Sequence, residues 1–171
     1  MSDASVNSIE RVDPRDRGAL RAALSVVLTG RVAPRDPTVD HLLAYVATAG
    51  LSLDHVYRAG ADGGGAATAV LPMPGGAAMV LVSPARGAAG PLAAAVSAAV
   101  AGLPASSRHL VQALLEPGQS REAAALRAAG FRRLAVLDYR AAVLEPPRGG
   151  VDGLAPLRER VLARAMNGAT P

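Results

Sequence analysis

A stretch of 45 residues, from 63 to 107, contains a single charged side chain, that of Arg86. The chain has 18 basic residues, all of them arginine, so a gap of this length in the charge pattern indicates burial. Prolines and glycines divide the stretch into short pieces, and none has the roughly 20 strongly apolar residues that a membrane span needs. The stretch therefore predicts several buried elements of a soluble core.

The 171 residues are enough for one domain that buries its own core. Half of the residues are apolar, yet the chain has one phenylalanine and no tryptophan, so small side chains must bring the backbone segments close together. We predict one domain over residues 1–145. A linker and a possible C-terminal helix or disordered tail are expected over residues 146–171.

Composition also excludes or disfavours several classes of function. Because cysteine is absent, disulfides, thiolate metal sites and cysteine nucleophiles are excluded, and a cytoplasmic location is compatible. The net charge is +4, but the arginines are scattered and aromatic residues are scarce, so we expect no nucleic-acid partner. The three histidines have no metal-ligand spacing, so we expect no metal. The N-terminal residues have no apolar core of a signal peptide.

Periodicity and the glycine and proline breaks predict an alternation of helices and strands. Strands are expected at 6–12, 54–60, 66–73, 77–83, 108–116 and 131–144, and helices at 17–30, 39–49, 90–103, 120–130 and 154–166. Thr38 is the expected N-cap of the second helix. The unit from 77 to 116 should contain a parallel strand pair with a right-handed crossover. The fold class is therefore α/β. We expect an α+β arrangement, in which helices pack on one mixed sheet.

The lone charge, Arg86, lies where a buried strand turns into a helix. One interpretation is an anion site, because a helix N-terminus presents free N–H groups and a guanidinium beside it adds a charged contact. The other is that Arg86 is an exposed loop residue that happens to interrupt a core segment. A glycine-rich turn alone does not separate these two interpretations.

The order of elements over residues 6–144 resembles the GNAT superfamily of acyl-CoA-dependent N-acyltransferases. The segment "VSPARGAAGPLAAAV" resembles the strand, acyl-CoA loop and helix of that family. The segment "LLEPGQSREAAALRAAGF" resembles its later strand and helix, which end in Gly-Phe, and "IERVDPRD" resembles its opening strand and turn. The resemblance implies a GNAT-like fold that binds acetyl-CoA as a co-substrate.

The resemblance further implies that backbone amides in the loop and first helical turn bind the pyrophosphate of the coenzyme, and that its pantetheine arm pairs with the preceding strand like an added strand. The family has an asparagine at the position that aligns with Gln119 of this sequence. The implied cofactor-binding residues are Leu81, Val82, Arg86, Gly87, Ala88, Ala89, Gly90, Pro91, Leu92 and Gln119.

The sequence departs from the family pattern at three positions. Ala89 and Pro91 replace two loop glycines, and proline has no N–H to donate. Leu126 takes the place of the tyrosine that protonates the departing thiolate in the family. Tyr139 is the candidate replacement acid, and Glu116, after an apolar strand, is the candidate base for the amine. Each of these two also fits an ordinary role, as a packing residue and a solvated carboxylate respectively.

The sequence thus predicts a cytoplasmic N-acetyltransferase that moves an acyl group to a small-molecule or peptide amine, without a membrane partner. Tyr45 and Tyr57 are candidates for lining the acceptor pocket or for filling the core. The alternative is a catalytically silent GNAT-like domain that binds CoA as a sensor or scaffold. The sequence leaves the acceptor, the acyl chain and the oligomeric state open.

Overall fold

A computed structural model describes residues 8–33, 35–60 and 65–136 of the chain. The chain divides into two units, residues 1–133 and 134–171, and every helix and strand described below belongs to the first unit. The domain boundary predicted at residue 145, the helix predicted at 154–166 and the candidate acid Tyr139 all lie outside the described residues. They remain predictions.

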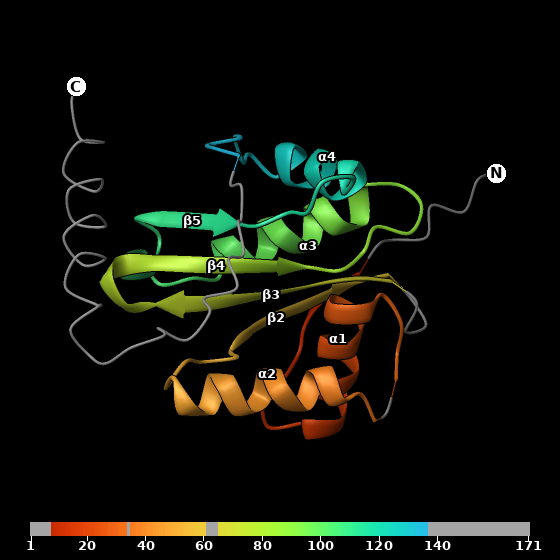
Figure 1. Cartoon of the computed structure of the whole chain (residues 1–171), viewed down its shortest axis with the longest axis vertical. Helices are drawn as coiled ribbons and strands as arrows, with labels where there is room; N and C mark the ends of the chain where they lie inside the picture. The colour runs from red at the N-terminus through yellow and green to blue at the C-terminus, as the bar shows by residue number, and fades with distance from the viewer. Residues whose placement is uncertain (1–7, 34, 61–64, 137–171) are drawn as a thin grey trace, which may run out of the picture. The chain divides into compact units, whose positions relative to one another are not determined.

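As far as the helix over Ser120–Ala128, the elements follow one another in the order predicted from the sequence (Figure 1). The described strands are β1 (Ile9–Arg11), β2 (His55–Ala59), β3 (Ala66–Met73), β4 (Ala77–Val82) and β5 (Leu110–Ala113). The helices are α1 (Arg17–Thr29), α2 (Pro37–Thr48), α3 (Gly90–Ala101) and α4 (Ser120–Ala128). Short 3-10 turns cover Pro74–Gly76 and Ala105–Ser107.

The five strands form one mixed sheet in the order β1-β2-β3-β4-β5. The first three pairings are antiparallel, and the β4–β5 pairing is parallel, as predicted for the unit from 77 to 116. Because β4 and β5 are parallel, their carboxyl ends meet at one edge of the sheet. The end of β2 and the start of β3 lie at that same edge, since Ala59 pairs with Ala66 and Thr68 pairs with Val82 at the end of β4.

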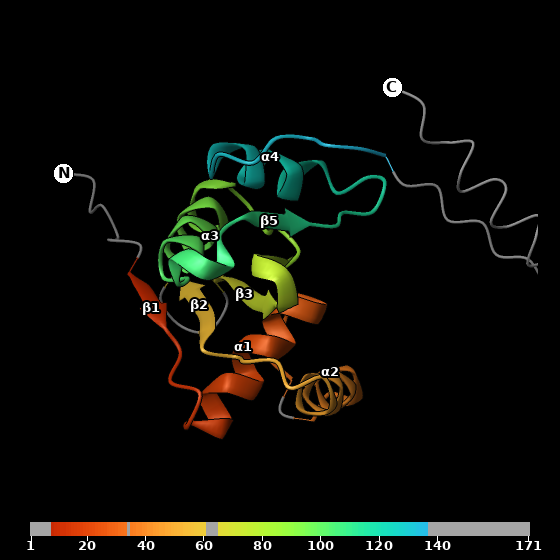
Figure 2. The same cartoon turned by 90° about the vertical axis from the view of Figure 1, so that its left-hand side faces the viewer.

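Helices cover both faces of this sheet (Figure 2). One face packs against α1 and α2, where Leu24, Val27 and Val39 join the buried residues of β2 and β3. The other face packs against α3 and α4, and α3 is buried on most of its surface, as its almost wholly apolar sequence predicted. The fold is therefore a mixed α/β domain with two cores, one on either side of a single sheet.

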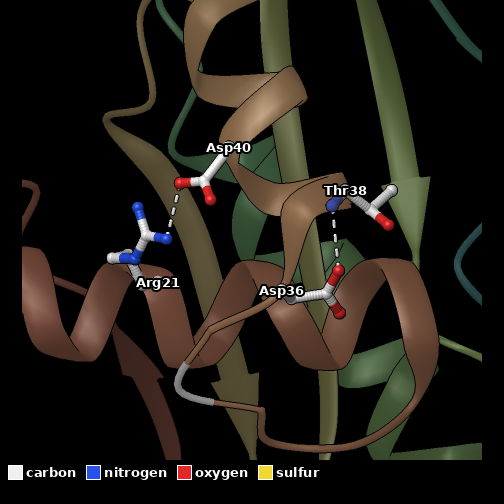
Figure 3. Close-up of polar contacts among 4 residues, drawn as sticks. All are labelled: Arg21, Asp36, Thr38 and Asp40. Atoms are coloured by element: carbon white, nitrogen blue, oxygen red, sulfur yellow. Dashed lines mark hydrogen bonds and ion pairs between the residues drawn. The ribbon is translucent and has the colours of Figure 1, made fainter.

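Figure 3 shows two polar contacts on the first face of the sheet, one at the start of α2 and one that joins α1 to α2. The Asp36 carboxylate accepts a hydrogen bond from the Thr38 amide at 2.9 Å, and Arg21 of α1 forms an ion pair with Asp40 of α2 at 2.6 Å. The prediction that Thr38 caps α2 is therefore wrong, because Asp36 is the N-cap and Thr38 lies inside the helix. Pro37 begins the helix because its fixed φ suits the first turn and its missing N–H is not needed there.

Two predicted strands differ from the structure. The strand at 108–116 is shorter, because pairing with β4 ends at Ala113. The strand predicted over 131–144 is wrong for residues 131–136, which are neither strand nor helix, and the rest of it lies outside the described residues. Leu134 and Val136 are 87% and 73% exposed in the described structure. In the described part of the chain, no helix has the length and apolarity to cross a membrane.

His55 at the start of β2 gives the fold a dependence on pH. Its Nδ1 atom is buried and has no hydrogen-bond partner among the described residues. Burial lowers the pKa of His55 from its usual 6.5, and Arg11 lowers it further while Asp54 opposes the change. The unfolded chain therefore takes up a proton near pH 6.5 that the folded chain takes up only at lower pH.

We expect the contribution of His55 to the free energy of unfolding to be constant above about pH 7 and to fall as the pH drops below that value. Urea denaturation at several pH values measures this loss. In His55→Gln the decrease below that pH should be smaller than in the parent protein. An equal decrease in both proteins would assign the pH dependence to other groups.

Candidate functional site

The predicted cofactor site lies at the sheet edge where β4 ends. The last β4–β5 pair is Val80 with Ala113, while β4 continues for two more residues, which pair only with β3 among the described strands. The end of β4 thus has one side without a partner strand in the described structure. The two residues concerned, Leu81 and Val82, are those predicted to face the pantetheine arm.

In an antiparallel pair, the N–H and C=O groups of successive residues point alternately toward and away from the partner strand, so those of Leu81 and Val82 point to opposite sides of β4. The amide of Ser83 donates to the carbonyl of Ala67 at 2.9 Å, so the neighbouring pair of Thr68 and Val82 is a non-hydrogen-bonded pair. The N–H and C=O of Val82 therefore face away from β3, toward the open side. Those of Leu81 face β3, and the Leu81 carbonyl also accepts from the Thr68 hydroxyl at 2.8 Å. Val82, not Leu81, is placed to pair with an added extended chain.

Ser83 ends the strand in a fixed way. It is fully buried, and its Oγ atom accepts a hydrogen bond from the Ala67 amide at 3.1 Å. The side-chain oxygen thus occupies the place that a strand carbonyl would take. The chain then leaves the sheet through the β4–α3 loop, residues 83–89, in which Gly87 has a φ of +91° that favours glycine.

The N-terminus of α3 has no side-chain cap, in contrast to α1 and α2. Asp16 and Asp36 cap those two helices with carboxylates, whereas the residue before α3 is Ala89, which has no side-chain acceptor. The Ala93 amide is bonded to the Ala89 carbonyl at 2.9 Å. Among the first residues of α3, Gly90 and Leu92 carry N–H groups for which no side-chain cap exists, and Pro91 carries none.

Arg86 lies between this helix end and the end of α1. Its side chain is exposed and makes no ion pair or side-chain hydrogen bond within the described residues. A Cβ atom built on Gly30, the last residue of the α1 cap, would come within 3.4 Å of the Arg86 Nε atom. The guanidinium is thus near the negative end of the α1 dipole, which is favourable by itself. Exposure fits the loop interpretation of Arg86, and its position beside α3 fits the anion interpretation.

A pocket of about 100 Å³ joins these features. It is bounded by the end of α1, the end of β2, the start of β3, the β4–α3 loop and the start of α3. The lining residues are Gly30, Ala59, Gly60, Gly65, Ala66, Pro84, Ala85, Arg86, Ala88, Pro91 and Leu92. Arg86 is the one charged residue of this lining. Sites for whole ligands usually measure about 300–1,000 Å³, so the pocket suits a small group of a larger ligand.

Glu116 and Gln119 are not part of this pocket lining. They lie in the β5–α4 turn, where the Glu116 amide donates to Oε1 of Gln119 at 2.7 Å and the Gln119 amide donates back to the Glu116 carbonyl at 3.2 Å. The Glu116 carboxylate is exposed. The turn follows the carboxyl end of β5, so the carboxylate lies at the same sheet edge as the end of β4.

The structure separates the other aromatic and histidine candidates. Tyr45 is 56% exposed on α2, and the Tyr57 hydroxyl lies against Gly102, at the end of α3 opposite the uncapped N-terminus. Leu126, which replaces the family tyrosine, is packed in the core between α4 and the sheet. His41 lies on α2, His55 lies on β2 and His109 lies just before β5. The described residues contain no group of three or more potential metal ligands of the His, Asp and Glu types.

Sequence reasoning missed one residue that contacts the predicted site. Glu122 of α4 is 8% exposed, and its Oε1 atom accepts a hydrogen bond from the Ala85 amide in the β4–α3 loop at 2.6 Å. A signal was present, because Glu122 has helical spacing with the buried residues Ala125 and Leu126. A carboxylate on the apolar stripe of a helix indicates a buried polar partner.

Comparisons with known proteins add little to this geometry. No protein-family model matches the chain, and no curated protein matches its sequence. A solved structure described as "Putative acetyltransferase from Agrobacterium tumefaciens str. C58" matches with a TM-score of 0.47 and 16% sequence identity. The match covers 78% of this chain and 99% of that chain.

Proposed function

We propose that this protein is an acyl-CoA-dependent N-acyltransferase of the GNAT type, which transfers an acetyl group from acetyl-CoA to an amine. The observation that carries the proposal is the junction of β4 and α3. A strand with one open side leads, through a short loop, into a helix whose N-terminus has no side-chain cap. An extended arm that ends in a diphosphate matches both parts of this junction.

The loop and the first helical turn suit a diphosphate in several respects. Four consecutive residues before Pro91 carry backbone N–H groups, and three of them, Gly87, Ala88 and Gly90, are exposed. A Cβ atom at Gly87 or Gly90 would meet nothing within 4 Å, so a ligand can approach the backbone at both glycines. The helix dipole and the nearby Arg86 supply positive charge. Pro91 has no N–H to donate, but the N–H groups of residues 87–90 and the guanidinium of Arg86 are still present.

The chemistry of the proposed reaction needs few protein groups. The acceptor nitrogen attacks the thioester carbonyl carbon, the carbon–sulfur bond breaks, and the sulfur leaves as a thiolate that takes up a proton. In this proposal Glu116 removes the proton that the acceptor ammonium must lose, and Tyr139 protonates the sulfur. Alignment of the two substrates along β4 provides the remaining acceleration, as proximity catalysis allows.

The second candidate function is a catalytically silent domain that binds CoA as a sensor or scaffold. It is favoured by Leu126, which is 5% exposed within the core and has no proton to give. Both candidates require coenzyme binding, and only the enzyme releases thiol.

The coenzyme tests both candidates. We expect CoA at 100 times its Kd to stabilise the protein by about 2.7 kcal/mol, seen as a rise in Tm. In Arg86→Ala the rise should be smaller, with about a tenfold weaker Kd, because one charge-assisted contact is worth about 1.4 kcal/mol. Differential scanning fluorimetry with a CoA titration measures both values.

Arg17→Ala is the matched control for this experiment, because Arg17 is exposed at the start of α1, the end of that helix opposite Gly30. It should leave the CoA response unchanged. Absence of a CoA response in the parent protein would contradict both candidates. Given a response, release of free thiol with a panel of amines selects the enzyme, and a lack of release selects the silent domain.

A further inference from the structure

Glu122 is a buried carboxylate in the first turn of α4. Moving a charged group out of water is costly unless it finds hydrogen-bond donors, so its partner in the interior is informative. The hydrogen bond recorded for the carboxylate comes from the main-chain amide of Ala85, 37 positions earlier in the chain. A side chain of α4 thus holds the backbone of the β4–α3 loop.

The same segment of loop is held from the opposite face of the sheet by α1. A Cβ atom at Gly30 would lie 3.3 Å from Pro84 and 3.4 Å from Arg86, so the bare backbone of Gly30 allows the loop to pack against the end of α1. Ala85 lies between these two contact points. Before it, Ser83 is fixed to Ala67 of β3.

The loop is exposed directly after these contacts. Gly87 and Ala88 are exposed, and no side-chain hydrogen bond holds either of them within the described residues. The direction in which their amides point therefore depends on how the preceding residues are fixed. Of those contacts, the one at Ala85 is a short, charge-assisted hydrogen bond, which is about twice as strong as a neutral one.

We propose that Glu122 is a positioning residue that fixes the β4–α3 loop in the conformation that presents its amides to the diphosphate of CoA. This inference rests on the proposed function for the identity of the ligand, whereas the ordering of the loop can be tested in the free protein. The role requires an acceptor oxygen at this place more than it requires charge. A negative charge near a diphosphate is unfavourable in itself, so a packing or charge role alone does not explain a carboxylate here.

The test compares Glu122→Gln, which keeps an acceptor oxygen, with Glu122→Leu, which is similar in size and has none. In the free protein, amide hydrogen exchange at Ala85 and over residues 86–90 should be at least about tenfold faster in Glu122→Leu and within about threefold of the parent in Glu122→Gln. The Kd of CoA, measured by calorimetry well below the Tm, should be about tenfold weaker in the leucine variant and within about threefold in the glutamine variant. Arg121→Leu, an exposed neighbour on α4, should change neither quantity.

The two readouts separate failure of this inference from failure of the proposed function. Unchanged exchange in Glu122→Leu overturns the inference, whether or not CoA binds. Equal loss of affinity in the glutamine and leucine variants also overturns it, because the acceptor oxygen would then not matter. If the parent protein does not bind CoA, the proposed function fails and hydrogen exchange alone decides the role of Glu122. If the leucine variant does not fold, Glu122→Asp, whose carboxylate is one methylene short of Ala85, replaces it.

Discussion

Leu24→Ala should lower the free energy of unfolding by about 3–5 kcal/mol, as expected for a fully buried leucine whose cavity does not close. Leu24 is 0% exposed on α1 and belongs to the core between the helices and the first face of the sheet. Its neighbours in that core include Ala23, Ala67 and Ala69, which are too short to move into the space. A loss of this size is a large fraction of the 5–15 kcal/mol that stabilises a typical domain.

Urea denaturation measures this effect, and the chain offers a matched leucine as control. Leu114 is 57% exposed just after β5, so Leu114→Ala should change the stability by less than about 0.5 kcal/mol. A loss below about 1.5 kcal/mol in Leu24→Ala would mean that the core relaxes around the cavity. That result would contradict the view that small side chains fix the distance between helix and sheet.

The order of helices and strands could be predicted because local signals agree with the final structure. Helical spacing in α1 and its stop at Gly30 are both present in the sequence and in the fold. In the described part of the stretch from 63 to 107, β3, β4 and α3 supply buried residues to the two cores, as predicted, while several loop residues between these elements are exposed. The N-cap of α2 was predicted wrongly because Asp36 and Thr38 are both good caps. The preference of proline for the first helical position decides between them.

The contacts that shape the candidate site could not be predicted in the same way. The open N-terminus of α3 is visible in the sequence, because Ala89 has no side-chain acceptor. The packing of Gly30 against Pro84 and the hydrogen bond from Ala85 to Glu122 join segments that are far apart along the chain. Local patterns carry no information on such pairs. The apolar spacing of Glu122 indicated burial, but the identity of its partner depends on the tertiary structure.

The second large effect is expected at the start of α3. Gly90→Asp should change the stability of the free protein by less than about 1 kcal/mol, because an acidic side chain is favoured in the first helical turn, whereas a Cβ directly before Pro91 disfavours the helical backbone. Gly90 has an exposed backbone at the first helical position, and an added Cβ would meet nothing within 4 Å. The same carboxylate would lie among the amides proposed to bind the diphosphate. Repulsion of about 2–3 kcal/mol should then weaken CoA binding by about 30- to 100-fold.

Gly90→Asn isolates the charge, because asparagine has almost the same shape as aspartate. Its CoA affinity should stay within about threefold of the parent, and thermal melts with a CoA titration measure stability and affinity for all three proteins. A loss of affinity in the aspartate variant alone distinguishes an anion site from a site that merely needs an intact helix, since damage to the helix would weaken CoA binding in the asparagine variant as well. Equal affinity in the aspartate and asparagine variants would place the diphosphate away from α3. The junction of β4 and α3 would then no longer support the proposed function.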